Sequence, residues 1–235
     1  MTEFEKELLA RIDRLTEENR QLREELKGQK KPTAAEKKKA AAPKGRAARA
    51  ITQEEYTELI DTMREGGCNF EPSDRNATLF VLQANLGLRL GDLLSLTPNS
   101  FVRDGSRWRL AIVEEKTGKE RNFTVPPEIM QYIESYCYRN HIGLDERIFP
   151  ITTRAAQKYL AKVTDYLDDD KGSMKNVTSH SFRKFFATNI YTQSGYNIAL
   201  VQELLQHASA ETTRKYVGIR TEAVEAAIRE NVNLR

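Results

Sequence analysis

The chain has 235 residues, of which 39% are hydrophobic and 30% are charged. The hydrophobic share is low for a single globule, so part of the chain is not expected to pack in a core. No stretch approaches the ~20 apolar residues that a membrane-spanning helix needs. The acidic, amphipathic first residues also lack the apolar block and cleavage site of a secretory signal.

The two cysteines, Cys68 and Cys137, lie far apart in unrelated surroundings. Their spacing fits neither a disulfide framework nor a zinc site, so we interpret them as reduced thiols. We therefore expect a soluble cytoplasmic protein.

The small net charge of +3 hides a strong segregation of charge along the chain. Residues 1–26 hold five Lys or Arg against eight Asp or Glu, and residues 27–50 hold nine against one. The remaining residues hold 23 against 25. The basic charge is thus concentrated in one short stretch, which favours a polyanionic partner for that stretch.

Residues 1–27 show the heptad pattern of a short leucine zipper. A polar Asn19 at a central core position is typical of two-stranded coiled coils, and Glu18 and Arg23 can pair across a dimer. We expect self-association through this helix. An amphipathic helix that packs on the body of a monomer is the alternative, because three heptads are few. The heptad core positions hold Leu8, Leu15 and Leu22 at d and Ile12, Asn19 and Leu26 at a.

Residues 28–50 contain two prolines and no large apolar side chain, so they cannot form a core. We interpret them as a flexible basic linker. Clustered Lys and Arg side chains gain affinity for DNA by releasing counterions, although a solvated tail without a partner is the alternative. The residues expected to contact DNA phosphates here are Lys37, Lys38, Lys39, Lys44, Arg46 and Arg49.

From Ile51 onward the sequence becomes globular, and helical signals come first. Thr52 and Glu55 form a capping box that predicts a helix to residue 63, before two glycines. An apolar helical run over residues 77–86 reaches Gly87, and a further helix is predicted from residue 91 to just before Pro98. After the double proline at 126–127 we predict helices over residues 128–139, 154–167, 181–193, 197–206, 210–217 and 221–231.

Between these helical parts the apolar period changes to two. Trp108, Leu110 and Ile112 alternate with polar residues before a turn at 116–119, and Phe123 and Val125 alternate after it. This pattern predicts a β-hairpin, joined by a short strand at residues 101–102. The predicted fold is mainly α with a small three-stranded antiparallel sheet, over residues 51–235.

The residues that can carry chemistry have structural interpretations when each is taken alone. Arg89 at the boundary of two apolar helices can simply pair with Asp92, three residues on. His180 and His207 would more often be structural hydrogen-bonding groups than catalysts. No cluster has the spacing of metal ligands, so no metal site is expected.

Four motifs taken together are more informative than these single residues. They are GLRLGDLLSL, EKTGKERNFTV, HSFRKFFAT and LLQHASAETTRKYV, in this order. Their order and spacing resemble the catalytic domain of the tyrosine recombinase, or phage integrase, family over residues 51–235. The residues of the family's catalytic set then fall on Arg89, Lys116, His180, Arg183, His207 and Tyr216.

The resemblance implies that Tyr216 attacks a DNA phosphodiester and forms a 3′-phosphotyrosyl intermediate. Such an intermediate conserves the bond energy, so strands can be exchanged without ATP and without a metal or other cofactor. Arg89 and Arg183 would stabilise the charge of the reacting phosphate, for which their planar, bidentate guanidinium groups are suited.

The resemblance also assigns proton transfer and further phosphate contacts. Lys116, at the tip of the hairpin, would protonate the departing 5′-oxygen, because an ammonium group releases a proton more readily than a guanidinium. His180 would hold the phosphate and assist Tyr216 as a base, and His207 would donate a hydrogen bond to a phosphate oxygen. The further DNA contacts expected in the body are Lys119, Arg121 and Lys184.

Two features depart from the common pattern of the family. Asp92 stands where Glu is usual, and we expect it still to orient Arg89 as a supporting residue. Residues 1–50 are too short and too polar to be the helical core-binding domain that usually precedes the catalytic domain, so we expect a minimal recombinase.

Val224, Ala227 and Ile228 share one face of the last predicted helix. This helix could dock on the body of its own chain or on a neighbouring protomer.

The sequence therefore predicts a site-specific DNA recombinase that acts in integration, excision, inversion or resolution, with a mobile element as the expected setting. Its expected partners are double-stranded DNA and further copies of itself, as a coiled-coil dimer and as a tetramer on two synapsed sites. In a bacterium or archaeon it would associate with the nucleoid. The alternatives are DNA relaxation of the type IB topoisomerase kind and a non-catalytic DNA-binding regulator.

Overall fold

A computed structural model describes residues 48–114, 118, 120–168, 172–206 and 210–217. The chain divides into two units, 1–46 and 47–235, and all described residues belong to the second. The predicted zipper, most of the predicted linker, the hairpin tip and the last predicted helix lie outside the described residues.

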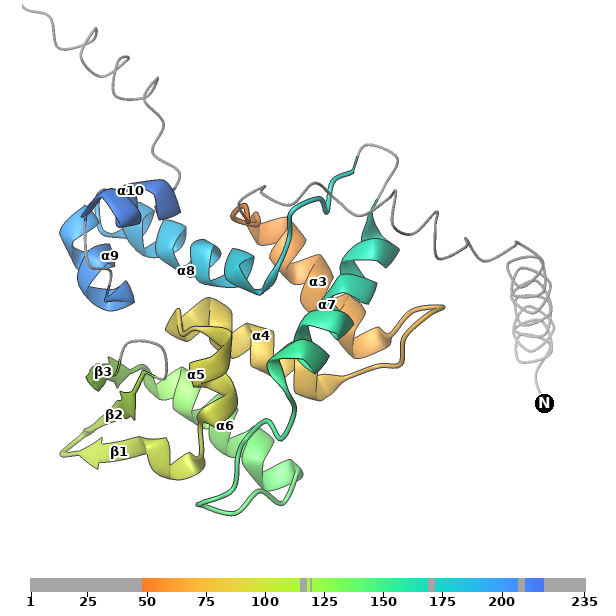
Figure 1. The fold of residues 1–235 in the computed structure, drawn as a ribbon. Coiled ribbons are helices and arrows are strands. Elements are labelled where there is room, and N and C mark those ends of the chain that lie inside the picture. Colours follow the sequence, from red (N-terminus) through yellow and green to blue (C-terminus); the bar gives the residue numbers. More distant parts are fainter. Residues whose placement is uncertain (1–47, 115–117, 119, 169–171, 207–209, 218–235) are drawn as a thin grey trace, which may run out of the picture. The chain divides into compact units, whose positions relative to one another are not determined.

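The second unit is mainly helical with one small sheet, as the sequence predicts (Figure 1). The helices predicted within the described residues are present, with ends that differ by a few residues. The elements are α3 (Gln53–Glu65), α4 (Asp74–Leu86), α5 (Leu90–Ser95), a 3₁₀ turn η1 (Pro98–Ser100), β1 (Phe101–Asp104), β2 (Arg107–Val113), β3 (Glu120–Val125), α6 (Pro127–Arg139), α7 (Thr153–Leu167), α8 (Ser179–Gln193), α9 (Ile198–Leu205) and α10 (Ala210–Val217).

Side-chain caps fix where several helices begin. The predicted capping box is present at α3, where Thr52 N–H donates to Glu55 at 2.8 Å and Glu55 N–H donates to the Thr52 hydroxyl at 3.2 Å. Two helices start earlier than their apolar pattern suggests, because Ser73 caps α4 and Thr178 caps α8. These hydroxyls satisfy N–H groups that have no partner within the first helical turn.

The sheet has the strand order β1-β2-β3, and both pairs are antiparallel. Leu110 pairs with Phe123 and Val113 with Glu120, so the predicted hairpin is confirmed. Leu110 and Val125 are buried, and Trp108 packs partly buried beside them. One face of the sheet thus lies against the first hydrophobic core, which α5 and α6 complete.

Helix α4 takes part in two cores through opposite faces. Leu79, Leu82 and Leu86 pack with the sheet side, whereas Phe80 and Ala84 pack with α3, α7 and α8. Apolar residues therefore cover all sides of α4, as is usual for a helix that is buried at the centre of a folded unit. Figure 1 shows α4 in this central place, with α8 running beside it.

Helix α8 joins the second core to a third, smaller one. Phe182 and Phe185 pack with α3 and α4, while Phe186 and Ala187 pack with Val201 and the rest of α9. Helix α10 lies against α8 and α9 at this end of the unit (Figure 1). The elements that carry the second arginine motif and the tyrosine motif are therefore neighbours.

The glycine after α4 is required by two independent constraints. Gly87 has φ 60°, in the left-handed region that glycine adopts at helix ends. A Cβ atom at this position would also clash with the ring of Phe186 on α8. The chain can therefore turn from α4 toward Arg89 only with glycine here.

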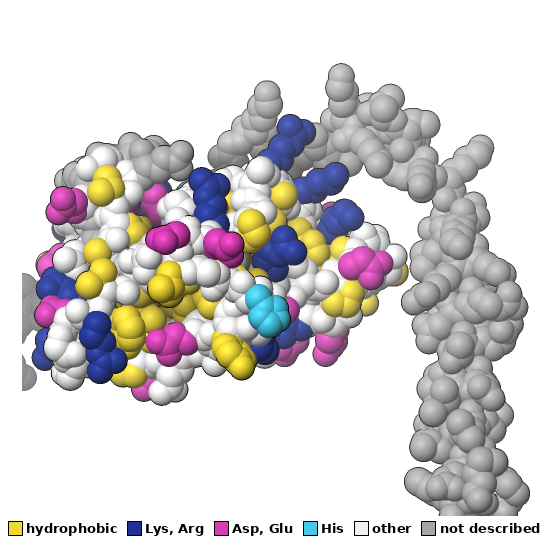
Figure 2. Space-filling model, turned by 90° about the horizontal axis from the view of Figure 1, so that it is seen from below, with side chains coloured by type: hydrophobic (Ala, Val, Ile, Leu, Met, Phe, Trp, Pro, Cys, Tyr) yellow, Lys and Arg dark blue, Asp and Glu magenta, His cyan; other side chains and the backbone are white. Residues whose placement is uncertain are grey.

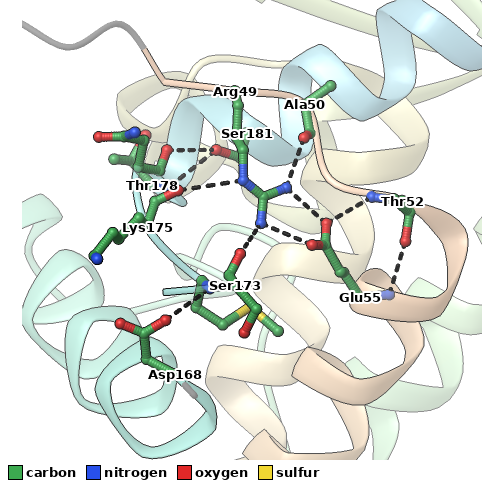
Figure 3. Close-up of polar contacts among 11 residues, drawn as sticks. Arg49, Ala50, Thr52, Glu55, Asp168, Ser173, Lys175, Thr178 and Ser181 are labelled. Carbon is green, nitrogen blue, oxygen red and sulfur yellow. Dashed lines mark hydrogen bonds and ion pairs between the residues drawn. The ribbon is translucent and has the colours of Figure 1, made fainter. Parts of the chain in front are cut away.

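The Arg49 side chain is held by hydrogen bonds to other residues of the second unit (Figure 3). Its guanidinium donates to both carboxylate oxygens of Glu55 at 2.7 Å, and to the backbone oxygens of Ala50, Ser173 and Lys175 at 3.0, 2.5 and 3.2 Å. Burial alone would raise the pKa of Glu55, but hydrogen bonds from Arg49 and Thr52 lower it below the usual value. The guanidinium thus has a structural role, and the expected contact of Arg49 with DNA stays a prediction.

On the face that Figure 2 shows, the described surface has no large area that carries charge of a single sign. Lys and Arg side chains are interspersed there with Asp and Glu. This mixture agrees with the nearly balanced charge of the sequence after residue 50. None of the helices in the described part of the chain is long and apolar enough to cross a membrane.

We predict that Arg49 stabilises the fold. Arg49→Ala should lower the free energy of unfolding by about 1–3 kcal/mol, because it leaves Glu55 without its cation and three carbonyl groups without a donor. Urea unfolding of the full chain measures this change. Arg154→Ala, which removes an exposed arginine of α7, is the matched control and should have little effect. Unchanged stability together with weaker DNA binding would instead favour a direct contact of Arg49 with DNA.

Candidate active site

Arg183 is the most deeply buried cation among the described residues. Its side chain lies on α8 and the residue is only 2% exposed. The guanidinium donates to the carbonyl of Gly87 at 2.5 Å and to the carbonyl of Leu205 at 2.8 Å. Burial lowers the pKa of this guanidinium, but arginine stays protonated in proteins.

Both carbonyl groups belong to helix ends, which explains why a buried cation is tolerated here. Gly87 follows the last residue of α4, and Leu205 is the last residue of α9. Carbonyl groups at a helix C-terminus have no partner within the helix and carry the negative end of its dipole. Arg183 therefore connects two helix ends and is held in a fixed place by them.

Arg89 lies at the start of α5 and pairs with two buried carboxylates. Its Nη1 donates a short hydrogen bond to Glu114 Oε2, and Asp92 Oδ2 lies 3.9 Å from the same nitrogen. Glu114 is fully buried and Asp92 is 2% exposed, whereas 22% of the Arg89 side chain is exposed. Arg89 is thus anchored from inside the protein and still reaches the surface.

Glu114 is a site residue that the sequence interpretation missed. A usable signal was present, because Glu114 continues the alternation of Leu110 and Ile112 along β2 and its extension. A position two residues after Ile112 points to the same side of the sheet, toward the core. A carboxylate at such a position indicates a buried cation nearby.

Tyr216 lies on α10, half-buried against the third core. Burial raises the pKa of its phenol, while the charge of Arg183, a hydrogen bond from Arg183 and the charge of Arg89 act in the opposite direction. The hydroxyl group is therefore protonated at neutral pH and lies in a field that favours the phenolate. Such a group can act as a nucleophile once a base or the substrate removes its proton.

Lys184 lies next to this tyrosine. Its Nζ lies 5.3 Å from the centroid of the Tyr216 ring, which is within the range of a cation–π contact. Burial lowers the pKa of the Lys184 ammonium group. Lys184 was expected to contact DNA, and this stays a prediction.

Among the expected site residues not yet placed, only His180 has a described side chain. His180 is exposed at the start of α8 and lines a hollow with residues of α7, although Arg183, one turn later, points into the core. The side chain of Arg121 on β3 lies outside the described part. The expected residues that lie wholly outside it are Lys37, Lys38, Lys39, Lys44, Arg46, Lys116, Lys119 and His207.

The described site therefore joins two arginines, two carboxylates and one tyrosine. Arg183 donates to the carbonyl of Gly87, two residues before Arg89, and its chain neighbour Lys184 lies 5.3 Å from the centroid of the Tyr216 ring, so α8 brings the arginines and the tyrosine to the same part of the unit. Two guanidinium groups beside a phenol can hold a phosphate for attack by the phenol oxygen. Among the described residues there is no group of three or more His, Cys, Asp or Glu that could hold a metal ion.

The fold and this arrangement define the catalytic domain of a tyrosine recombinase. The model of the phage integrase family matches residues 49–222, so the chain belongs to the phage integrase family. The tyrosine recombinase XerA of Pyrococcus furiosus is 27% identical over 191 residues, which cover 79% of this chain and 62% of that protein. XerC of Rhizobium meliloti is 31% identical over 181 residues, which cover 73% of this chain and 54% of that protein.

Solved structures show the same fold. The XerH site-specific recombinase bound to a palindromic difH substrate, in a post-cleavage complex, matches with a TM-score of 0.57 and 20% identity. The match covers 78% of this chain and 53% of that one. This chain thus spans between half and two thirds of the length of the curated relatives XerA and XerC.

We predict that Arg89 lowers the pKa of Tyr216. Arg89→Ala removes a positive charge and leaves Glu114 without its cation, and both changes disfavour the phenolate. The Tyr216 pKa should therefore rise above its value in the wild type. Titration of ¹³C-labelled tyrosine by NMR measures it, with Tyr216→Phe for assignment. Arg109→Ala, at a partly exposed arginine of β2, is the control. An equal pKa in wild type and Arg89→Ala would contradict the prediction.

Proposed function

We propose that this chain is the catalytic part of a site-specific DNA recombinase. The observation that carries the proposal is that α8 places Arg183 on the carbonyl of Gly87, two residues before Arg89, and places Lys184 beside the half-buried Tyr216. This arrangement provides a nucleophile and two cations for a phosphodiester in one place, and family membership supports the same chemistry. The sequence outside the described residues supplies further candidates for proton transfer.

The reaction follows from the chemistry of these groups. The phenol oxygen of Tyr216 attacks the phosphorus of a DNA phosphodiester, and the bond from phosphorus to the 5′-oxygen breaks. The tyrosine is then joined to the 3′-phosphate, and the proton that the departing oxygen receives gives a free 5′-hydroxyl group. Attack by the 5′-hydroxyl of another strand reverses these steps and joins the new partners without an external energy source.

Arg89 and Arg183 act on the phosphate during this exchange. Charge on the two non-bridging oxygens is stabilised best by donors that are already in place before the reaction. Arg183 meets this condition because two helix ends hold it, and Arg89 because two carboxylates do. We assign proton donation to the leaving oxygen to Lys116, assistance of Tyr216 to His180, and a hydrogen bond to a non-bridging oxygen to His207.

Double-stranded DNA is the proposed substrate. The XerH structure is a complex with its difH substrate, and the Tn1549 transposon integrase has been solved with transposon right end DNA. The biological outcome in this protein is integration, excision, inversion or resolution, and we favour a mobile element as its setting. We further propose that residues 1–27 pair protomers and that four protomers act on two synapsed sites.

Covalent capture tests the chemistry. Wild-type protein mixed with fragmented, nicked DNA of the source organism should give SDS-resistant adducts attached to DNA 3′ ends at one recurring sequence. Tyr216→Phe should give none, because it lacks the nucleophile. Tyr138→Phe, at a tyrosine that is 84% exposed, should behave like the wild type.

The recovered ends also separate the rival functions. Adducts from Tyr216→Phe, or none from the wild type on nicked DNA, would contradict the proposed chemistry and favour a regulator. Relaxation of supercoiled DNA without a recurring sequence would favour a topoisomerase of type IB.

The N-terminal segments are predicted to supply affinity and assembly. Deleting residues 28–46, which spares Arg49, should weaken DNA binding for all sequences. It should also reduce the slope of log affinity against log salt concentration by ~0.9 for each phosphate that the shortened chain no longer neutralises.

A chain that starts at Ala47 should also lose self-association in sedimentation. An unaltered salt slope would make the linker a passive tether, and unaltered assembly would remove the zipper from the proposal.

A further inference from the structure

Glu114 is a fully buried carboxylate beside the proposed reaction site. A carboxylate without water keeps its charge only when cations or hydrogen-bond donors surround it. Arg89 supplies such a cation, through a short hydrogen bond from Nη1 to Oε2. The backbone of the same residue is also fixed, because the Glu114 carbonyl accepts the N–H of Gly118 at 2.8 Å.

The contact of Arg89 with Glu114 is closer than its contact with Asp92, which is the one that the sequence predicts. Asp92, the residue expected to orient Arg89, lies 3.9 Å from Nη1 and belongs to the same short helix. Glu114 comes from the end of β2, a different element, so it fixes Arg89 relative to the sheet. Two carboxylates from two directions restrict the guanidinium more than either one alone.

Within the described part of the chain, both carboxylates contact the same nitrogen of Arg89. A guanidinium offers paired donors along an edge, which match two oxygens of a phosphate. The pairing with Glu114 holds this guanidinium from inside the protein, while 22% of the Arg89 side chain stays exposed.

The carboxylates also limit the charge of the site. Arg89 and Arg183 contribute two positive charges, and Asp92 and Glu114 contribute two negative charges. Without DNA the four groups are together close to neutral. Glu114 therefore weakens the simple attraction of the site for a phosphate while it improves the geometry of Arg89.

We propose that Glu114 is a positioning residue that acts through Arg89 on the reacting phosphate. This inference rests on the proposed function. It requires that loss of the Glu114 charge has opposite effects on two steps: binding of DNA becomes equal or tighter, and cleavage becomes slower. A residue needed only for folding would weaken both.

The test uses the full chain and a nicked duplex that carries the sequence recovered from covalent adducts. Glu114→Gln should slow formation of the adduct by about 10–100-fold, because a small displacement of a catalytic group has effects of this size. Its Kd for DNA should not rise. Glu120→Gln, at an exposed carboxylate on the neighbouring strand β3, is the matched control and should leave both quantities unchanged.

A change of substrate separates positioning from general damage. A methylphosphonate at the cleavage position removes the negative charge that Arg89 stabilises. On this substrate the difference between wild type and Glu114→Gln should shrink to less than about threefold, since the transition state then depends little on Arg89. An equal slowing on both substrates, or a rate equal to that of wild type on the phosphate, would overturn the proposal.

A second measurement is independent of DNA. The Nε–H signal of Arg89 in ¹⁵N-labelled protein, assigned with Arg89→Lys, reports whether the guanidinium is held. In Glu114→Gln this signal should broaden or exchange faster with water, and Glu114→Asp should lie between the two. An Arg89 signal identical in wild type and Glu114→Gln would refute the positioning role. Absence of cleavage by the wild type, with the expected change of this signal, would instead refute the proposed function alone.

Discussion

The contact of Arg183 with two helix ends determines how the site is assembled. A buried guanidinium must find acceptors, and here the acceptors are the carbonyl groups that end α4 and α9. The charge of the same side chain acts to lower the pKa of Tyr216 on α10, against the effect of burial. One cation therefore connects the central helix α4 with α9 of the small third core, so the position of this guanidinium is determined by the fold itself.

Arg89 is held in place by a different kind of partner. It remains partly exposed and depends on carboxylates rather than on helix ends. Because Glu114 lies at the end of β2, the sheet has a direct part in placing an arginine that belongs to the helical layer. This gives a physical reason for a small sheet in a mainly helical unit: it supports one of the two cations from the side.

Much of the fold could be predicted from local signals in the sequence. The capping box at Thr52 and the period-two hairpin are short-range patterns, and both are confirmed. The contacts of Arg49 with Glu55 and with a distant loop could not be foreseen, because composition places Arg49 among the residues of a basic linker. The meeting of Arg89, Arg183 and Tyr216 came from a family resemblance, since no local rule relates residues so far apart.

The distribution of charge separates affinity from chemistry in the proposed recombinase. Residues after 50 are nearly balanced in charge, and the described site is itself close to neutral. Such a unit has little long-range attraction for DNA, whereas the basic stretch at residues 27–50 has a large one. Arg49 then has a specific place in this arrangement, because it fixes the end of the basic stretch to the loop that leads into α8. The sequence therefore predicts that affinity for DNA comes from the basic stretch, whereas the chemistry comes from the nearly neutral unit that carries Arg183.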